Sequence, residues 1–167
     1  VLMPMKALPY PHEVVEEVQN GSHYRLEGRL RNNGGGQFQY TLSGEGRFLA
    51  NGVEHRLVPG RGFLACHCDP NHAYYYPPEA TETWRFIWIS FEGGHSEAMI
   101  DELVDRYGYL YDLPLDSGLI RKLTAYRSYR DSVHVVTPLD GAQIVLDVLA
   151  NLVAEREREQ IKMPQST

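Results

Sequence analysis

The sequence predicts a mainly β protein that ends in α-helices. Before about residue 92, short runs rich in β-branched and aromatic residues are separated by Gly, Pro and Asn, as in "HYRLEGRL", "NHAYYYP" and "WRFIWISFEG". Runs with this punctuation are typical of antiparallel strands. After residue 92 the apolar residues recur with the period of a helix. The chain of 167 residues has the length of one domain with a well-buried core.

The first element expected is an extended N-terminal arm. The opening "VLMPMKALPYPHE" has three prolines in its first eleven residues and no apolar periodicity, so it does not resemble a core element. Among the strands that follow, "LSGEG" and "ANGVE" place glycines where a hairpin or a sharp corner needs a positive φ. The dipeptide Asn51-Gly52 is a strong signal for a two-residue hairpin turn.

Two helices are expected between residues 95 and 130. The first is predicted from "HSEAMIDELVDRYG", which ends at Gly108, a residue suited to the position after a helix. Its apolar face consists of Met99, Ile100, Leu103, Val104 and Tyr107. The second helix is expected from Ser117 to about Arg130.

The third helix has the clearest signals. Thr137 is a good N-cap, and Pro138 fits the first helical position. The apolar stripe that follows consists of Ala142, Val145, Leu146, Leu149, Leu152 and Val153. The helix then runs into the charged segment "EREREQIK", which predicts a solvated face. A helix with this stripe packs either on its own barrel or on the same helix of a partner.

The charge balance argues against nucleic-acid binding by this chain. There are 16 basic and 22 acidic residues, a net charge of −6, and no Lys/Arg run longer than two. A DNA-binding surface needs a basic patch, so any DNA contact is expected to come from elsewhere. No apolar run approaches the length of a membrane span and no signal-peptide core opens the chain, so we expect a cytoplasmic protein without membrane contact.

The segment "ACHCDPNHAYYYP" raises the question of a metal site. Cys66 and Cys68 share one face of a strand, whereas His67 points to the opposite face, so these residues do not converge on one ion. Cysteine packs as a small hydrophobe, and a lone C-x-C is a weak metal signal. We therefore interpret Cys66 as strand core and Cys68 as the strand end, both as reduced thiols.

Four motifs in order give the chain a family resemblance. They are a "Y-x-L-x-G-x-G" segment at Tyr40 to Gly46, "L-x-P-G" at Leu57 to Gly60, "P-x-H-x-Y" at Pro70 to Tyr74, and "W-x3-W-x2-F" at Trp84, Trp88 and Phe91. Together with the helices after them, these segments resemble the sensory domain of AraC-family transcription regulators over residues 24–160. The resemblance implies a cupin-type double-stranded β-helix, a jelly-roll barrel able to hold one small ligand.

The resemblance also implies a division of the chain. Residues 1–15 are expected to form the arm, 16–93 the cupin-like barrel, 94–161 a helical dimerisation segment, and 162–167 the start of a linker to an absent DNA-binding domain. By this resemblance Val145, Leu149 and Leu152 belong to a helix that pairs two copies into a homodimer.

Catalytic members of the cupin class bind a metal, which makes a stand-alone cupin isomerase or oxygenase the alternative function. Such enzymes use two histidines and a glutamate before the "LSGEG" segment and one histidine from the "P-x-H" strand. Here the window 30–37, "LRNNGGGQ", has no histidine and no carboxylate, and Gln37 stands where the glutamate would be. His72 alone does not hold a divalent cation against water. We therefore expect no catalytic residues, no metal and no cofactor.

The expected function is effector sensing for a transcription regulator. Strand alternation and the resemblance place His72, Tyr74 and Trp88 in the pocket. The resemblance adds Arg29, with Arg31 as the alternative if the register shifts by two. Aromatic faces, hydrogen-bond donors and an arginine suit a sugar-like effector or a small acid. DNA is expected to be bound only through a C-terminal helix-turn-helix domain that is not in this chain.

Overall fold

The computed structural model describes residues 1–127 and 133–162 as an ordered sequence of strands followed mainly by helices. The first five strands are β1 (Tyr10–Gln19), β2 (Arg25–Glu27), β3 (Gly36–Ser43), β4 (Gly46–Ala50) and β5 (Val53–Leu57). The others are β6 (Arg61–Cys66), β7 (His72–Tyr75), β8 (Trp84–Glu92) and β9 (Leu110–Asp112). A short 3-10 helix, η1 (Gly28–Leu30), follows β2. The helices are α1 (Ser96–Tyr107), α2 (Gly118–Arg127) and α3 (Pro138–Lys162).

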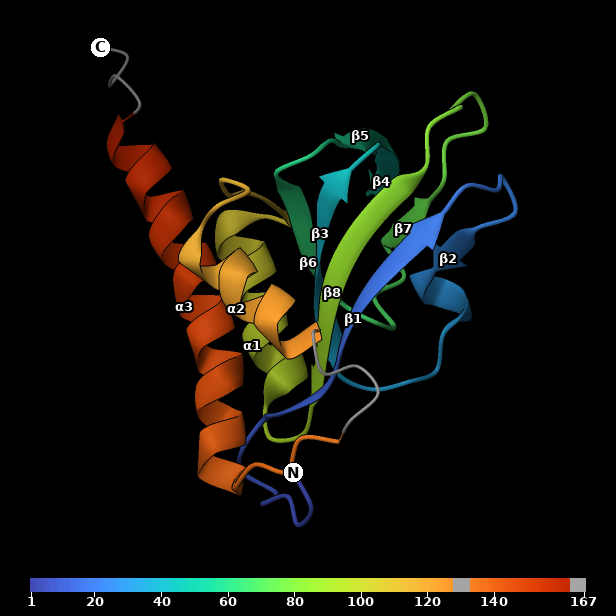
Figure 1. Cartoon of the computed structure of the whole chain (residues 1–167). Helices are drawn as coiled ribbons and strands as arrows, with labels where there is room; N and C mark the ends of the chain where they lie inside the picture. The colour runs from blue at the N-terminus through green and yellow to red at the C-terminus, as the bar shows by residue number, and fades with distance from the viewer. Residues whose placement is uncertain (128–132, 163–167) are drawn as a thin grey trace.

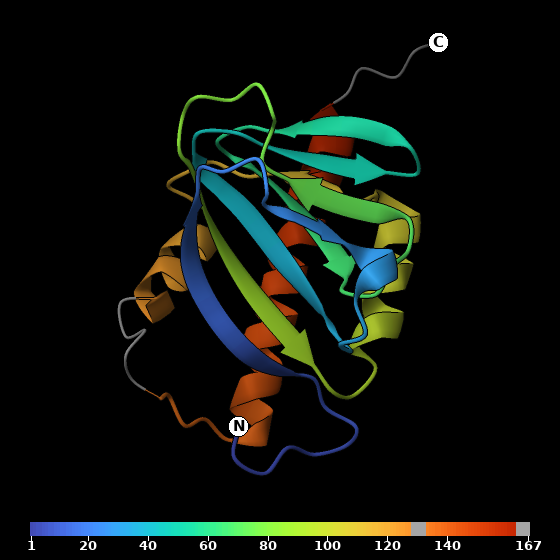
Figure 2. The ribbon, with the colours of Figure 1, turned by 90° about the vertical axis from the view of Figure 1, so that its right-hand side faces the viewer.

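The strands form two antiparallel sheets that face each other. One sheet has the order β1-β8-β3-β6-β9 and the other the order β2-β7-β4-β5. Figure 2 shows the two sheets curving around a common interior. This arrangement is the cupin-type jelly-roll barrel with C-terminal helices that the sequence predicts.

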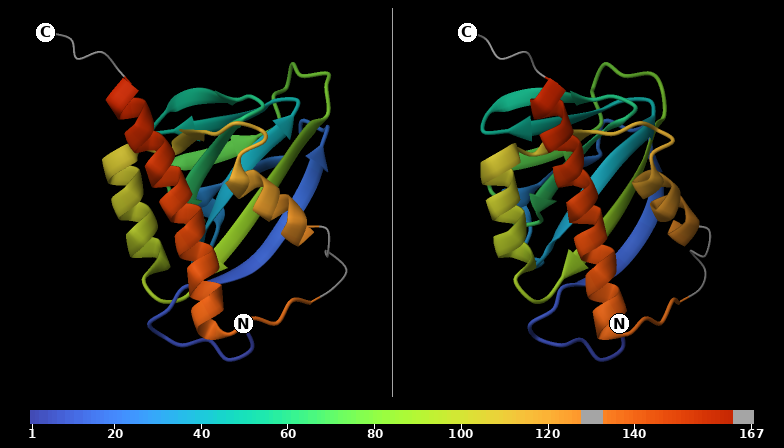
Figure 3. Two further views of the ribbon diagram at one scale, coloured as in Figure 1. Left: turned by 60° about the vertical axis from the view of Figure 1, so that its left-hand side comes forward. Right: turned by 90° about the vertical axis from the view of Figure 1, so that its left-hand side faces the viewer.

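The three helices cover the outer face of the five-stranded sheet (Figures 1 and 3). Between them and the sheet lies an outer core, which contains Ile87 and Ile89 from β8, Ile100 from α1 and Leu123 from α2. On β8 the side chains alternate, so Trp84 and Phe86 instead point inside the barrel. There they form an inner core, packed with Phe48, Leu57, Phe63 and Tyr76.

The strongest local signals are confirmed. Asn51 (φ 50°) and Gly52 (φ 81°) form the turn between β4 and β5, with Ala50 paired to Val53. At the end of α1, Gly108 has a positive φ of 89° and its N–H donates to the Val104 carbonyl at 2.8 Å. At the start of α3, the Asp140 N–H donates to Thr137 Oγ1 at 3.1 Å.

The glycines of "LSGEG" form a corner, not a hairpin. Gly44 has a φ of 71°, and the strands on either side of it, β3 and β4, belong to different sheets. A Cβ at Gly44 would lie 2.1 Å from the Thr83 carbonyl oxygen, so glycine is required both for the backbone conformation and for the close approach.

Two parts of the expected division differ from the structure. The N-terminal arm was expected to reach residue 15, but β1 begins at Tyr10 and pairs with β8 up to Gln19. Because β1 is an edge strand, it tolerates Pro11, and its register shifts between Pro11 and Glu13. In addition, β9 lies within the segment expected to be helical and pairs with β6. The predicted end of the second helix, residues 128–130, falls outside the described residues.

The dimerisation residues are also corrected. Val145, Leu149 and Leu152 have exposed fractions of 0%, 4% and 0%, because they pack in the outer core against their own sheet. These three residues of the apolar stripe are thus intramolecular core, and their side chains are not available to a second copy. From the same helix, Leu146 is 48% exposed.

Across the parts of the chain that the structure describes, none of the helices combines the length and the apolar character that a membrane span requires.

Candidate ligand-binding site

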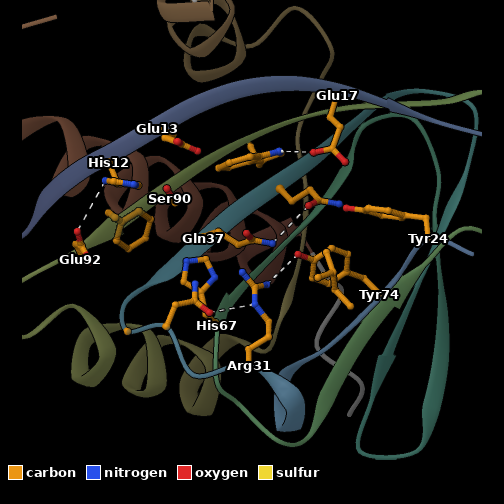
Figure 4. Close-up of a pocket in the computed structure, with 16 residues that line it drawn as sticks. His12, Glu13, Glu17, Tyr24, Arg31, Gln37, His67, Tyr74, Ser90 and Glu92 are labelled. Carbon is orange, nitrogen blue, oxygen red and sulfur yellow. Dashed lines mark hydrogen bonds and ion pairs between the residues drawn. The ribbon is translucent and has the colours of Figure 1, made fainter. Parts of the chain in front are cut away.

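A cavity of about 350 Å³ lies inside the barrel beside the inner core. Its walls come from both sheets and from the segments that join them: β1, β3 and β8 on one side, β2, β7 and the chain after η1 on the other. Figure 4 shows the side chains of these elements converging on this space. One part of the barrel is therefore filled with aromatic rings, and the other part is hollow and polar.

The polar wall follows from the strand register. Ser90 on β8 pairs with Gln37 on β3 and with Glu13 on β1, so side chains from three neighbouring strands form one row across the inner face. Gln39 pairs with Trp88 in the next row. Strand alternation places Phe38 and Tyr40 in the outer core and the two glutamines inside.

Three buried polar atoms of the cavity wall lack a hydrogen-bond partner among the described residues. They are Gln39 Nε2, His67 Nδ1 and Ser90 Oγ, on residues with exposed fractions of only 2%, 5% and 6%. An unpaired buried polar group costs about 1–3 kcal/mol. Three such groups on one cavity wall are therefore the mark of a binding surface rather than of a well-packed core.

Arg31 brings a positive charge to the cavity. Its Nη1 donates to the Tyr74 hydroxyl at 3.0 Å, and its Nε donates to Asn33 Oδ1 at 3.3 Å (Figure 4). Burial raises the pKa of Tyr74, and the nearby Arg31 charge opposes that rise. Burial, helped by the Arg31 charge, lowers the pKa of His67 to about 4, so His67 is neutral at physiological pH.

Two carboxylates of the cavity, those of Glu17 and Glu92, accept hydrogen bonds from other side chains. Trp88 Nε1 donates to Glu17 Oε1 at 3.2 Å, and the Tyr10 hydroxyl donates to Glu92 Oε1 at 3.1 Å. Burial raises the pKa of Tyr24, and the Tyr74 and Glu17 side chains raise it further. With its N–H group engaged by Glu17, Trp88 contributes its ring to the cavity wall.

The four residues predicted for ligand binding divide into two groups. Tyr74 and Trp88 line the cavity. His72 lies outside the lining: it is buried, stacks on Phe48 with ring centroids 5.8 Å apart, and its Nδ1 is 2.9 Å from the Asp69 carbonyl oxygen. Desolvation lowers the pKa of His72, and the structure gives it a packing role.

Arg29 does not reach the cavity. It lies on η1, its side chain is 63% exposed, and it pairs with Glu27 at 3.1 Å. The expectation assumed a strand through this segment, but the chain turns through η1 after β2, so residues 29 and 31 do not share a face. The cavity arginine is Arg31, the alternative that the sequence left open.

Sequence reasoning missed most of the polar residues of the wall, among them Gln37, Gln39, His67 and Ser90. Two signals were present. Gln37 and Gln39 alternate with aromatic residues on β3, and His67 was already placed on the face opposite Cys66. A polar side chain on the inner face of a barrel strand indicates either a buried network or a ligand site.

The cysteines match the interpretation in part: Cys66 is the last residue of β6 and packs in the outer core, whereas Cys68 lies two residues beyond the end of the strand. Cys66 is buried, and its Sγ lies 3.4 Å from Asp101 Oδ1 on the helix side of the sheet. Burial, followed by the charge of Asp101, raises the pKa of the Cys66 thiol. Cys68 is exposed, and its Sγ lies 2.8 Å from the Asn33 carbonyl oxygen. Within residues 1–127 and 133–162, no three His, Cys, Asp or Glu side chains form a group that could hold a metal ion.

We expect purified protein to carry far less than about one iron, manganese or zinc ion per chain, because one imidazole does not retain a divalent ion against water. Elemental analysis of dialysed protein measures this directly, with His23→Ala as an exposed-histidine control for His72→Ala. About one ion per chain, lost in His72→Ala but kept in His23→Ala, would contradict the prediction.

The two-sheet barrel and its polar cavity define the chain as a cupin-type ligand-binding domain. It belongs to the AraC-like ligand binding domain family, whose family model matches residues 20–138. No curated protein matches the sequence closely enough to count as a relative.

One solved structure, that of ToxT, supports the fold. ToxT from Vibrio cholerae is similar with a TM-score of 0.50 and 8% identity, over 87% of this chain and 58% of ToxT. The AraC-like transcriptional activator CuxR is similar with a TM-score of 0.47 and 13% identity, over 86% of this chain and 48% of CuxR. The chain thus spans little more than half the length of ToxT. At these identities the likeness concerns the fold and says nothing about the ligand.

Proposed function

We propose that this chain is the effector-sensing domain of an AraC-type transcription regulator and acts by binding, not by catalysis. The observation that carries the proposal is the cavity inside the barrel, whose wall presents unpaired buried polar atoms and an arginine. Membership in a family of ligand-binding domains supports the same function.

The alternative, a stand-alone cupin enzyme, has less support. The cavity wall offers hydrogen-bond donors and the Arg31 charge, and His67 is neutral. The part of the chain that the structure describes holds no group of three metal ligands. A cupin isomerase or oxygenase of the usual kind depends on such a group.

In the proposed regulator, DNA is bound by a helix-turn-helix domain outside this sequence. The net charge of −6 supports this division, because duplex binding depends on basic side chains that neutralise phosphates. Pairing of two copies is part of the proposal. Since Val145, Leu149 and Leu152 are buried in their own chain, the pairing surface must use other residues.

A thermal-shift screen of sugars, sugar acids, hydroxy acids, amino acids and fatty acids tests the proposed function. We expect one class to raise the melting temperature of the wild-type chain. A ligand at a hundred times its Kd raises the free energy of unfolding by about 2.7 kcal/mol. For a domain of this size, that corresponds to a rise of roughly 5–10 °C in the melting temperature. Trp88→Ala should remove most of the shift, because Trp88 lines the cavity.

Tyr75→Ala is the matched control, because Tyr75 follows Tyr74 on β7, does not line the cavity, and lies beside Arg25 at 4.6 Å. Its shift should equal that of the wild type. A shift that survives Trp88→Ala, or a screen in which no class stabilises the chain, would overturn the proposed function.

A further inference from the structure

Resting on the proposed function, we propose that the effector is a small hydroxylated carboxylate of the sugar-acid type. Its carboxylate is bound by Arg31, and its hydroxyl groups are bound by the side chains of Gln39, His67 and Ser90. Three features of the cavity lead to this class: the charge of Arg31, the unpaired polar atoms of the wall, and the size of the space.

Arg31 lacks an acidic partner. Among the described arginines, most form an ion pair with a carboxylate, and only Arg31 and Arg121 do not. Arg121 lies exposed on α2, where water solvates its charge. Arg31 is half-buried and turns its guanidinium toward the Tyr74 hydroxyl inside the cavity. A guanidinium binds a carboxylate through two parallel hydrogen bonds, so an anionic ligand supplies the partner that the chain does not.

The acidic residues of the cavity lie on the side opposite this charge. Figure 4 shows Glu13, Glu17 and Glu92 on the side of β1 and β8, across the cavity from Arg31. Glu17 and Glu92 accept hydrogen bonds from Trp88 and Tyr10. They favour hydroxyl groups at that side and disfavour a second negative charge. The cavity therefore suits a ligand with one anionic end and a neutral polar body.

The body of the ligand must be hydroxylated. Gln39 Nε2 is a donor, the Ser90 hydroxyl donates and accepts, and the neutral His67 ring offers Nδ1 in either role. All three residues are more than nine-tenths buried and line the cavity. An alkyl chain would leave these atoms unpaired, which excludes a fatty acid as the best ligand. A neutral sugar would pair them but leave Arg31 without an anion.

The size of the cavity limits the ligand to about one sugar ring. Its volume of about 350 Å³ is near the lower end of the range of roughly 300–1,000 Å³ for small-molecule sites. The Trp88 ring offers a flat apolar surface for the carbon-hydrogen face of such a ring.

Titration calorimetry on the whole chain tests this class with five probes: D-galacturonate, D-glucuronate, D-galactose, D-glucose and hexanoate. We expect at least one of the two acids to bind tenfold or more tightly than its neutral sugar and than hexanoate. Arg31→Met should lower the affinity for that acid by tenfold or more and should abolish the difference in affinity between the acid and its neutral sugar. Arg31→Lys should lower the affinity for the acid by a smaller factor. Arg29→Met removes a charge two residues away outside the cavity and should change the affinity by less than twofold.

Three results would overturn the inference: equal binding of an acid and its neutral sugar, tighter binding of hexanoate, or an equal loss of affinity in Arg31→Met and Arg29→Met. In each of these cases the cavity still binds a small molecule, so the proposed function survives. If none of the five probes binds, the inference is also overturned, and the wider thermal-shift screen decides the proposed function separately.

Discussion

Replacing Leu149 by glutamate is expected to unfold the isolated chain, not to separate a dimer into folded monomers. Leu149 is 4% exposed and packs in the outer core between α3 and the five-stranded sheet. Truncating a buried leucine to alanine already costs about 2–5 kcal/mol, and a buried unpaired carboxylate adds a large desolvation cost. The loss should approach the whole free energy of unfolding, which is about 5–15 kcal/mol for a domain of this kind.

Leu146→Glu is the matched control. It makes the same leucine-to-glutamate change on the same helix, at a position that is 48% exposed. It should change the free energy of unfolding by less than about 0.5 kcal/mol. Urea unfolding followed by circular dichroism gives both values, and size-exclusion chromatography gives the oligomeric state. If Leu149→Glu were a folded monomer while the wild type is a dimer, the stripe would be an intermolecular contact after all.

The sequence was ambiguous about this helix for a physical reason. An apolar stripe at helical spacing records that one face is buried, but it does not record what covers that face. Val145 and Leu152 are equally suited to a partner helix and to the chain's own sheet. In the structure, α1, α2 and β8 pack against the stripe. Which surface covers the stripe is therefore decided by tertiary contacts, which the local sequence does not specify.

Local signals predicted the fold well. The turn at Asn51 and Gly52, the end of α1 at Gly108 and the cap of α3 at Thr137 each depend on a few adjacent residues, and all three are confirmed. The β1 strand was missed because Pro11 and its glutamates weaken the alternation, and its place in the sheet is specified by pairing with the distant β8.

The candidate site was only partly predictable. The family resemblance, together with strand alternation, placed Tyr74 and Trp88 on the inner face, and they line the cavity. Arg29 was misplaced because η1 interrupts the strand, and a single 3-10 turn has no strong sequence signal. Gln39 and Ser90 belong to no recognisable motif. Their place on the cavity wall follows only from the register in which β3 pairs with β8.

We expect the double variant Gln37→Leu with Gln39→Met to be more stable than the wild type and unable to respond to the effector. Gln37 Nε2 donates to Gln39 Oε1 at 3.4 Å. A single substitution would leave the other amide without this hydrogen bond, so both residues are changed together. Replacing a buried polar pair by apolar groups of similar shape is neutral or stabilising, and here the unpaired Gln39 Nε2 is removed as well. The free energy of unfolding without ligand should rise by about 1–3 kcal/mol.

The same change should weaken effector binding by more than tenfold, because the hydroxyl-binding part of the wall becomes apolar. Urea unfolding and calorimetry measure the two effects on one protein preparation. Gln143→Leu, an exposed glutamine on α3, is the control and should alter neither quantity. If the double variant lost stability, the two amides would be a structural network. If it gained stability and kept full affinity, the ligand would bind elsewhere. In a ligand-binding cavity, the polar wall destabilises the empty barrel and stabilises the occupied one. The double variant should therefore show a higher free energy of unfolding without ligand and a lower affinity for the effector.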